Sequence, residues 1–187
     1  MGFMEKLLEL IPPHPLKDAV NAFPGKNMVI FKPKIIFEGP FYSDYYQFDL
    51  TLNEVPPLTV EKNVFPIEKN KLFPINPDQV FGAVAQSEVK GYLTVLINKD
   101  IIREMAHSAF GKRDVFFENA FTTIDDETWY LIKQYMRETS NMQKGYEFVQ
   151  DGITMQLCIN LMRNLKSNLR LEKKGARSSF KSYKKSY

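Results

Sequence analysis

Three closely spaced prolines limit what the middle of this chain can form. Pro66, Pro74 and Pro77 each lack a backbone N–H and fix φ at about −65°, so this segment cannot be helical. Two short apolar runs, 63–67 and 71–75, flank a polar turn, and an extended pattern resumes after a second turn that begins at Asn76. Short strands joined by tight turns predict an antiparallel meander, as in a small barrel or jelly roll.

Three further segments have strand patterns. Residues 28–37 are apolar but contain Pro33, which predicts an edge strand or a bent strand. Residues 45–52 alternate, with Tyr46, Phe48, Leu50 and Leu52 on one face, which predicts a half-buried strand. Residues 91–97 are apolar on both faces, as expected for a central strand.

Helical spacing replaces the strand pattern after residue 99. Helices are predicted over 100–110 and 125–139, the second begun by a capping box of Thr123 and Asp126. A long third helix is predicted to run to about Leu169. Because the strands precede the helices, the fold class is α+β, an antiparallel β-barrel with helices on one side.

Composition and charge describe an ordinary globular chain with a basic end. The chain has 187 residues and a single cysteine, Cys158, which excludes an internal disulfide and fits a reducing, cytoplasmic location. No apolar run approaches the roughly 20 residues that span a bilayer. Residues 163–187 carry a net charge of +8, so the remainder carries −5 within the total of +3. A basic tail of this kind indicates a solvated linker, or a segment that leads toward a polyanion.

The run Leu72-Phe-Pro-Ile-Asn-Pro-Asp-Gln-Val-Phe81 has the frame L-x-x-I-x-P-x-x-x-F. It resembles the cupin-type effector-binding domain at the N-terminus of AraC/XylS-family transcription regulators. The order of strands and helices over 28–170 is similar to that of the family. The resemblance implies a cupin-like jelly roll that binds a small-molecule effector, forms a homodimer and relays the signal to a DNA-binding half. Phe81 stands where the family often has histidine, which argues for a more apolar pocket.

The resemblance also suggests a division of the chain. Residues 1–27 are expected to form an N-terminal arm with a short helix, and 28–98 the cupin-like barrel. Residues 99–170 are expected to form a helical subdomain that contains the dimerisation helix. Residues 171–187 are then a basic linker or the start of a DNA-binding half absent from this chain, which is expected to be an isolated domain or a truncated form. On its own, the chain is therefore expected to bind no DNA sequence-specifically and no membrane.

The candidate ligand-binding residues are aromatic. They are Tyr46, Phe48, Phe65, Phe73, Phe81 and Tyr92 on strands, and Trp129 on a helix; an ordinary core role is the alternative for each. The chain has only two histidines, His14 and His107, at no ligand spacing, so no catalytic metal and no cofactor are expected. Cys158 lies on the apolar side of a helix, where a small buried hydrophobe is expected.

These observations favour an effector-sensing and dimerisation domain of an AraC-like regulator, and not an enzyme. The alternatives are a stand-alone cupin-like small-molecule-binding protein without DNA-binding function, or a cupin enzyme with an unusual site. Leu161, Leu165 and Leu169 of the long helix are the predicted dimer contacts. The competing interpretation is that the whole stripe of this helix is intramolecular core.

Overall fold

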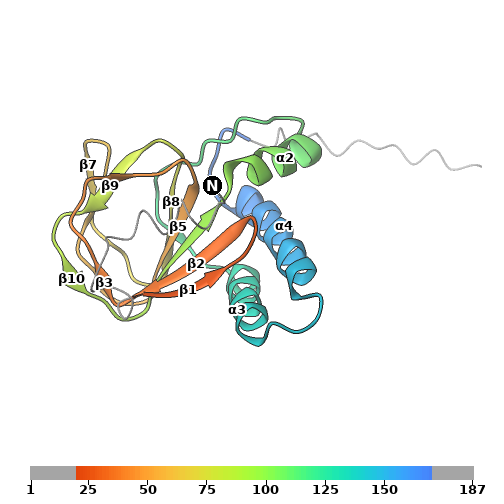
Figure 1. Ribbon diagram of the computed structural model, residues 1–187. Coiled ribbons are helices and arrows are strands. Elements are labelled where there is room, and N and C mark those ends of the chain that lie inside the picture. The colour runs from red at the N-terminus through yellow and green to blue at the C-terminus, as the bar shows by residue number, and fades with distance from the viewer. Residues whose placement is uncertain (1–19, 170–187) are drawn as a thin grey trace, which may run out of the picture.

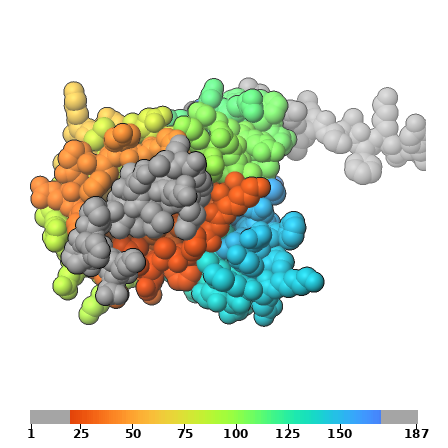
Figure 2. Space-filling view, viewed as in Figure 1, coloured from red at the N-terminus to blue at the C-terminus, as the bar shows by residue number. Residues whose placement is uncertain are grey.

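The computed structural model describes residues 20–169 of the chain. The short helix expected near the N-terminus and the basic segment 171–187 lie outside these residues. Strands fill the first part of the described chain, and three helices with one two-residue strand fill the second. The two parts adjoin along one face of a sheet (Figure 1). Figure 2 shows them as neighbouring masses, red to yellow-green for the strands and green to blue for the helices.

The larger sheet has six antiparallel strands. Their spatial order is β1 (Val20–Pro24), β2 (Met28–Pro33), β11 (Tyr92–Ile97), β5 (Tyr46–Thr51), β8 (Lys71–Ile75) and β12 (Thr122–Thr123). Strand β1 pairs with β2 over its whole length, from Val20 with Pro33 to Pro24 with Val29. Residues 20–27 therefore belong to the sheet, and the predicted arm boundary at residue 27 is corrected.

A second, four-stranded sheet lies against the inner face of the first. Its order is β4 (Phe41–Tyr42), β9 (Val80–Ala83), β6 (Leu58–Val60) and β7 (Asn63–Phe65). A short pair joins β3 (Ile35–Ile36) to β10 (Ser87–Glu88). The α+β class is confirmed, with the strands arranged as a β-sandwich; closure into a barrel stays a prediction.

Two strands differ from their sequence predictions. Residues 28–37 do bend, since the chain leaves β2 after Pro33 and re-forms as β3 in another sheet. Strand β2 lies between β1 and β11, however, so it is not an edge. Every residue of β5 is buried, and this strand is not half-buried as predicted, because its polar face is covered by the second sheet.

The helices are α2 (Lys99–Phe110), α3 (Asp126–Asn141) and α4 (Tyr146–Asn164). Helix α3 is capped by Asp125, whose carboxylate accepts a hydrogen bond from the Thr128 N–H at 2.8 Å. This corrects the predicted capping box of Thr123 and Asp126. Helix α4 ends at Asn164 instead of near Leu169, because the backbone becomes extended at Leu165. No helix in the described range is long and apolar enough to cross a bilayer.

The main hydrophobic core lies between the helices and the larger sheet. Tyr46, Phe48 and Leu50 of β5 enter it from the sheet, and Phe117 contacts Tyr46 and Phe48 edge-on. The Tyr135 hydroxyl of α3 donates a hydrogen bond to the Met28 carbonyl at 2.5 Å, which fixes α3 against β2. These contacts pack the helix-side face of the larger sheet closely against the helices.

Leu161, Leu165 and Leu169, the predicted dimer contacts, belong to this core. Their exposed fractions are 2%, 7% and 4% within the single chain. These leucines cannot also present a free surface to a partner, which corrects the choice of the dimer side of the helix. Their placement matches the competing interpretation, in which this stripe is intramolecular core. The homodimer itself stays a prediction.

Candidate functional site: an apolar cavity with a buried carboxylate

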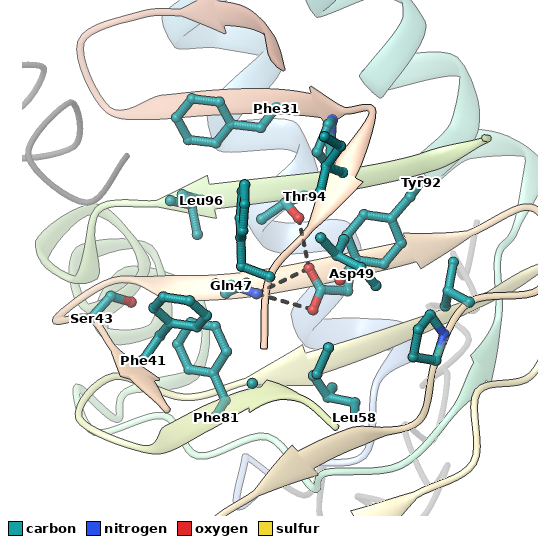
Figure 3. A pocket seen from close by; sticks show the side chains of 18 of the residues that line it. Phe31, Phe41, Ser43, Gln47, Asp49, Leu58, Phe81, Tyr92, Thr94 and Leu96 are labelled. Atoms are coloured by element: carbon teal, nitrogen blue, oxygen red, sulfur yellow. Dashed lines mark hydrogen bonds between the residues drawn. The ribbon is translucent and has the colours of Figure 1, made fainter. Parts of the chain in front are cut away.

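A cavity of about 220 Å³ lies between the two sheets. The residues that line it are mostly apolar and come from eight strands and the loops between them, and Figure 3 shows many of them. The lining includes Phe31, Ile35, Ile36, Phe37, Phe41, Val55, Leu58, Ile67, Phe81, Ala83 and Leu96. An apolar cavity with few polar groups is the usual form of a small-molecule site.

Apart from Ser43, the polar side chains that line the interior of the cavity gather around Asp49. Gln47 donates through Nε2 to both carboxylate oxygens, at 3.1 and 3.0 Å, and Thr94 donates through Oγ1 to Oδ1 at 2.9 Å (Figure 3). The Tyr92 side chain is also hydrogen-bonded to this carboxylate. The cavity therefore combines an apolar body with one concentrated acidic point.

Burial governs the ionisation of this cluster. Asp49 is 1% exposed, and loss of hydration raises its pKa to about 6 although the neighbouring donors act in the opposite direction. Burial beside this carboxylate also raises the pKa of the Tyr92 hydroxyl well above its usual value, so Tyr92 stays protonated. Near neutral pH the cavity thus holds a carboxylate among neutral donors.

Strand alternation and register place these residues. In β5, Gln47 and Asp49 face the cavity while Tyr46 and Phe48 face the helices, since successive side chains point to opposite sides. Thr94 of β11 is paired directly with Asp49, and Leu96 with Gln47. The donor–acceptor contact between Thr94 and Asp49 is therefore a cross-strand pair on the inner face of the sheet.

The predicted ligand residues fall into three places. Phe81 and Tyr92 line the cavity. Phe65 and Phe73 also lie between the sheets, in a cluster with Leu58, Ile67 and Phe81 that adjoins the cavity.

The remaining predicted ligand residues lie elsewhere. Tyr46 and Phe48 point to the helix side of the sheet, where the Tyr46 hydroxyl donates to the Val115 carbonyl at 2.6 Å. Trp129 lies on α3 at the margin of the same core. The Lys133 ammonium nitrogen lies over its indole ring, 5.0 Å from the ring centroid. The structure thus brings four of the seven predicted residues together between the sheets and separates three.

Sequence reasoning missed Gln47, Asp49 and Thr94. The available signal was the alternation of β5, whose second face carries Tyr45, Gln47, Asp49 and Thr51. A polar strand face is normally exposed to solvent, but the second sheet covers this face of β5. Only knowledge of that second layer assigns the polar residues to an interior cavity.

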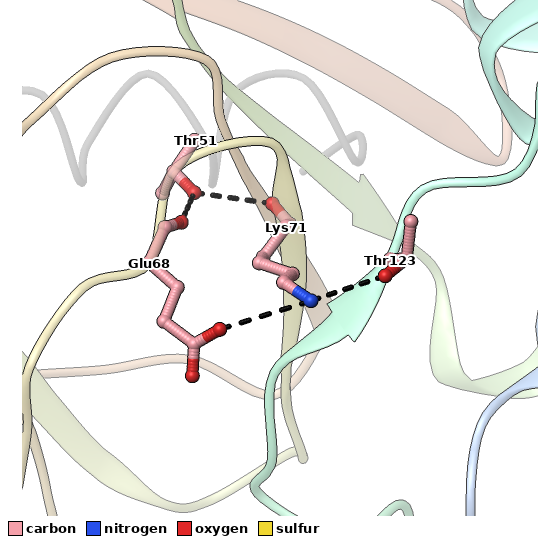
Figure 4. A network of polar contacts seen from close by, with 4 residues as sticks. All are labelled: Thr51, Glu68, Lys71 and Thr123. Atoms are coloured by element: carbon pink, nitrogen blue, oxygen red, sulfur yellow. Dashed lines mark hydrogen bonds and ion pairs between the residues drawn. The ribbon is translucent and has the colours of Figure 1, made fainter.

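Another polar network lies at the end of β5, outside the cavity (Figure 4). Thr51 donates through Oγ1 to the carbonyls of Glu68 and Lys71, at 2.5 and 3.2 Å. The Lys71 ammonium group contacts the Glu68 carboxylate at 3.7 Å and donates to Thr123 Oγ1 at 3.1 Å. The Thr51 bonds to two carbonyls fix the turn before β8, and the Lys71 bond to Thr123 joins β8 to β12.

Metal-ligating chemistry is sparse in the described part of the chain. Between residues 20 and 169, no group of three or more His, Cys, Asp or Glu side chains could hold a metal ion. His107 is exposed on α2, and His14 lies outside the described residues. Cys158 is buried in the main core, where burial raises the pKa of its thiol to about 12.

Comparison with known proteins gives only a partial likeness. No protein-family model matches the chain. No curated protein matches it either. Among solved structures, an oxalate decarboxylase variant from Bacillus subtilis is similar at 13% identity and a TM-score of 0.30, over 46% of this chain and 29% of that one. A second, described as "A Structural Element that Modulates Proton-Coupled Electron Transfer in Oxalate Decarboxylase", is similar at 12% identity, a TM-score of 0.29 and the same coverage. The likeness spans less than a third of those chains.

Proposed function

We propose that this chain binds a small, largely apolar molecule between its two sheets and acts as an effector-sensing domain. The observation that carries the proposal is the apolar cavity of about 220 Å³ with its single acidic cluster. An engineered cavity of about 150 Å³ holds a benzene ring, so the volume suits a molecule of one ring and a short side chain. The resemblance to AraC-like regulators supports a sensing role with a DNA-binding half as the responding part.

The arrangement of β5 supports a route from the cavity to the helices. Asp49 faces the cavity, and its neighbour Phe48 packs on Phe117 in the helix-side core, with ring centroids 5.4 Å apart. A ligand that moves the inner face of β5 would therefore change the packing beneath the helices directly. Such a relay needs a ligand that binds two packings of this core with different affinity.

We place the proposed homodimer contact on the outer face of α4. Phe148, Gly152, Met155 and Ile159 recur at helical spacing there, and Phe148 is 83% and Met155 41% exposed. Apolar side chains on both sides of a helix indicate that the second side also meets a surface. The same patch on two chains could pair about a twofold axis.

A ligand screen by thermal shift, followed by calorimetry, tests the binding proposal. A true ligand at 100 times its Kd should add about 2.7 kcal/mol to the free energy of unfolding. Ala83 lies on the cavity-facing side of β9, two residues from Phe81, so Ala83→Leu should fill the cavity and abolish binding while the chain stays folded. Ala85→Leu adds the same volume at an exposed position and should bind normally. Equal binding by both variants would contradict the proposed site.

A further inference from the structure

The charge of Asp49 has no counterion among the described residues that line the cavity. None of these lining residues is lysine, arginine or histidine. The groups that bond to the carboxylate are an amide, a hydroxyl and a phenol, from Gln47, Thr94 and Tyr92. These groups orient the carboxylate and donate the hydrogen bonds that water would otherwise supply, but none of them carries a positive charge. A buried carboxylate without a cation is unusual because ionised groups are normally paired when they are buried.

The fold does not need an ionised group at this position. The raised pKa of Asp49 means that its charged form is less favourable in the folded chain than in water. A neutral side chain of similar shape would avoid this cost while the strand pairing of β5 and β11 persisted. A costly charge placed at the wall of a cavity is typical of a group that serves a ligand.

Aromatic rings surround the same space. Phe31, Phe41, Phe81 and Tyr92 all contribute side chains to the cavity, and Asp49 lies among them in Figure 3. The faces of aromatic rings attract cations, and they do so more strongly when the cation is desolvated. Carboxylate and aromatic walls together favour an ammonium group over a neutral or anionic one.

We propose that the molecule bound in this cavity is a cationic amine: an ammonium head that pairs with Asp49, joined to an apolar tail of about one ring. This inference rests on the proposed function, since it names the ligand class for the same cavity. The Asp49 carboxylate supplies the charge, and Gln47 and Thr94 hold it in position. The apolar walls, including Leu58 and Leu96, accept the tail.

Three probes with similar tails and different heads separate the possibilities. Phenethylamine, phenethyl alcohol and hydrocinnamate present a cation, a neutral hydroxyl and an anion. Calorimetry on the full chain at roughly pH 8 keeps the amine protonated, since simple amines have pKa values of about 10. We expect the amine to bind at least about tenfold more tightly than the alcohol, and hydrocinnamate to bind most weakly.

Two variants connect any preference to Asp49. Asp49→Asn should lower amine affinity to about that of the alcohol, so that the preference for the amine is lost. Asp78→Asn removes the same charge from an exposed turn with φ of 66°, a conformation that asparagine tolerates, and should bind like the parent. A circular-dichroism spectrum and a melting curve establish that both variants are folded.

The outcomes separate this inference from the function on which it rests. If the alcohol binds as tightly as the amine, or Asp49→Asn keeps the amine preference, the cationic ligand is wrong while binding in the cavity stands. If hydrocinnamate binds best, the charge assignment is reversed and the inference also fails. If none of the three binds, and the broader screen finds no ligand sensitive to Ala83→Leu, both the inference and the proposed function are contradicted.

Discussion

The side chain of Asn76 pairs with both backbone groups of Phe117. Its Nδ2 donates to the Phe117 carbonyl, and its Oδ1 accepts from the Phe117 N–H, each at 2.8 Å. Asn76 directly follows β8, and Phe117 lies outside any strand. The Asn76 amide therefore bonds to the Phe117 backbone as a neighbouring strand would. Phe117 is fully buried against Tyr46 and Phe48, so this pair of bonds fixes the ring that separates β5 from the helices.

We expect Asn76→Ala to destabilise the chain by about 2–4 kcal/mol. The change leaves a buried N–H and a buried carbonyl without partners, and each such group costs about 1–3 kcal/mol. The free energy of unfolding in urea measures the effect. Asn63→Ala, at an exposed position of β7, is the matched control and should change stability by less than about 0.5 kcal/mol. Similar values for the two variants would show that the Asn76 bonds do not hold Phe117.

Asp49 should make the ligand-free chain more stable in mild acid than at neutral pH. Its pKa is about 6 in the folded chain and near 3.8 when exposed, so the folded state binds the proton more tightly. The contribution is therefore fully present below about pH 4 and is lost as the pH rises through about 6. It amounts to about 3 kcal/mol.

Comparison with Asp49→Asn isolates this effect from other titrating groups. The difference in unfolding free energy between parent and variant, measured from about pH 4 to 7, should move in favour of the variant as the pH rises. A constant difference over this range would mean that Asp49 is not desolvated as described.

Gly39 and Gly82 approach too closely for any side chain. A Cβ on Gly39 would lie 2.6 Å from the Gly82 Cα, and the contacting atoms are backbone that cannot turn aside. We expect Gly82→Ala to cost about 1–3 kcal/mol in thermal or urea unfolding. Gly152→Ala in α4 meets nothing within 4 Å and should instead stabilise the helix by about 1 kcal/mol. Two effects of the same sign would contradict this packing.

Glutamate substitutions distinguish the two sides of α4. Leu165→Glu with Leu169→Glu should unfold the chain, because both leucines are buried in the main core. Met155→Glu places charge on the outer face and should give a folded monomer if that face forms the proposed dimer. Sedimentation velocity and circular dichroism provide the two measurements.

Gln143→Glu adds the same charge at an exposed position before α4 and is expected to sediment like the parent. A folded Leu165→Glu, Leu169→Glu variant would argue against their placement in the core. A parent chain that is monomeric at tens of micromolar would end the dimer proposal, wherever the contact is placed.

Local pattern was sufficient to predict most of the elements but not their surroundings. The alternation of residues 45–52 and the proline-limited run 71–75 gave strands close to β5 and β8, since backbone preference and side-chain period act locally. The N-cap of α3 was assigned to Thr123 instead of Asp125 because threonine and aspartate are both acceptable N-cap residues by sequence.

The candidate site depended on information that the sequence does not carry locally. Phe81 and Tyr92 were predicted because aromatic residues on strands often face an interior. Tyr46 and Phe48 satisfy the same rule but face the helices. Because β5 is buried on both faces, the alternation of its residues does not show which face lines the cavity and which packs on the helices. Gln47 and Asp49 were missed for the same reason.

The two covered faces of β5 leave the chain free to vary its chemistry without losing its architecture. Positions 46, 48 and 50 belong to the core that supports the helices, whereas positions 47 and 49 face the cavity. Substitutions at the second set can therefore alter which molecules are accepted while the first set preserves the fold. Related sequences would be able to diverge in ligand preference by changing only the cavity-facing residues of this strand, at little cost to stability.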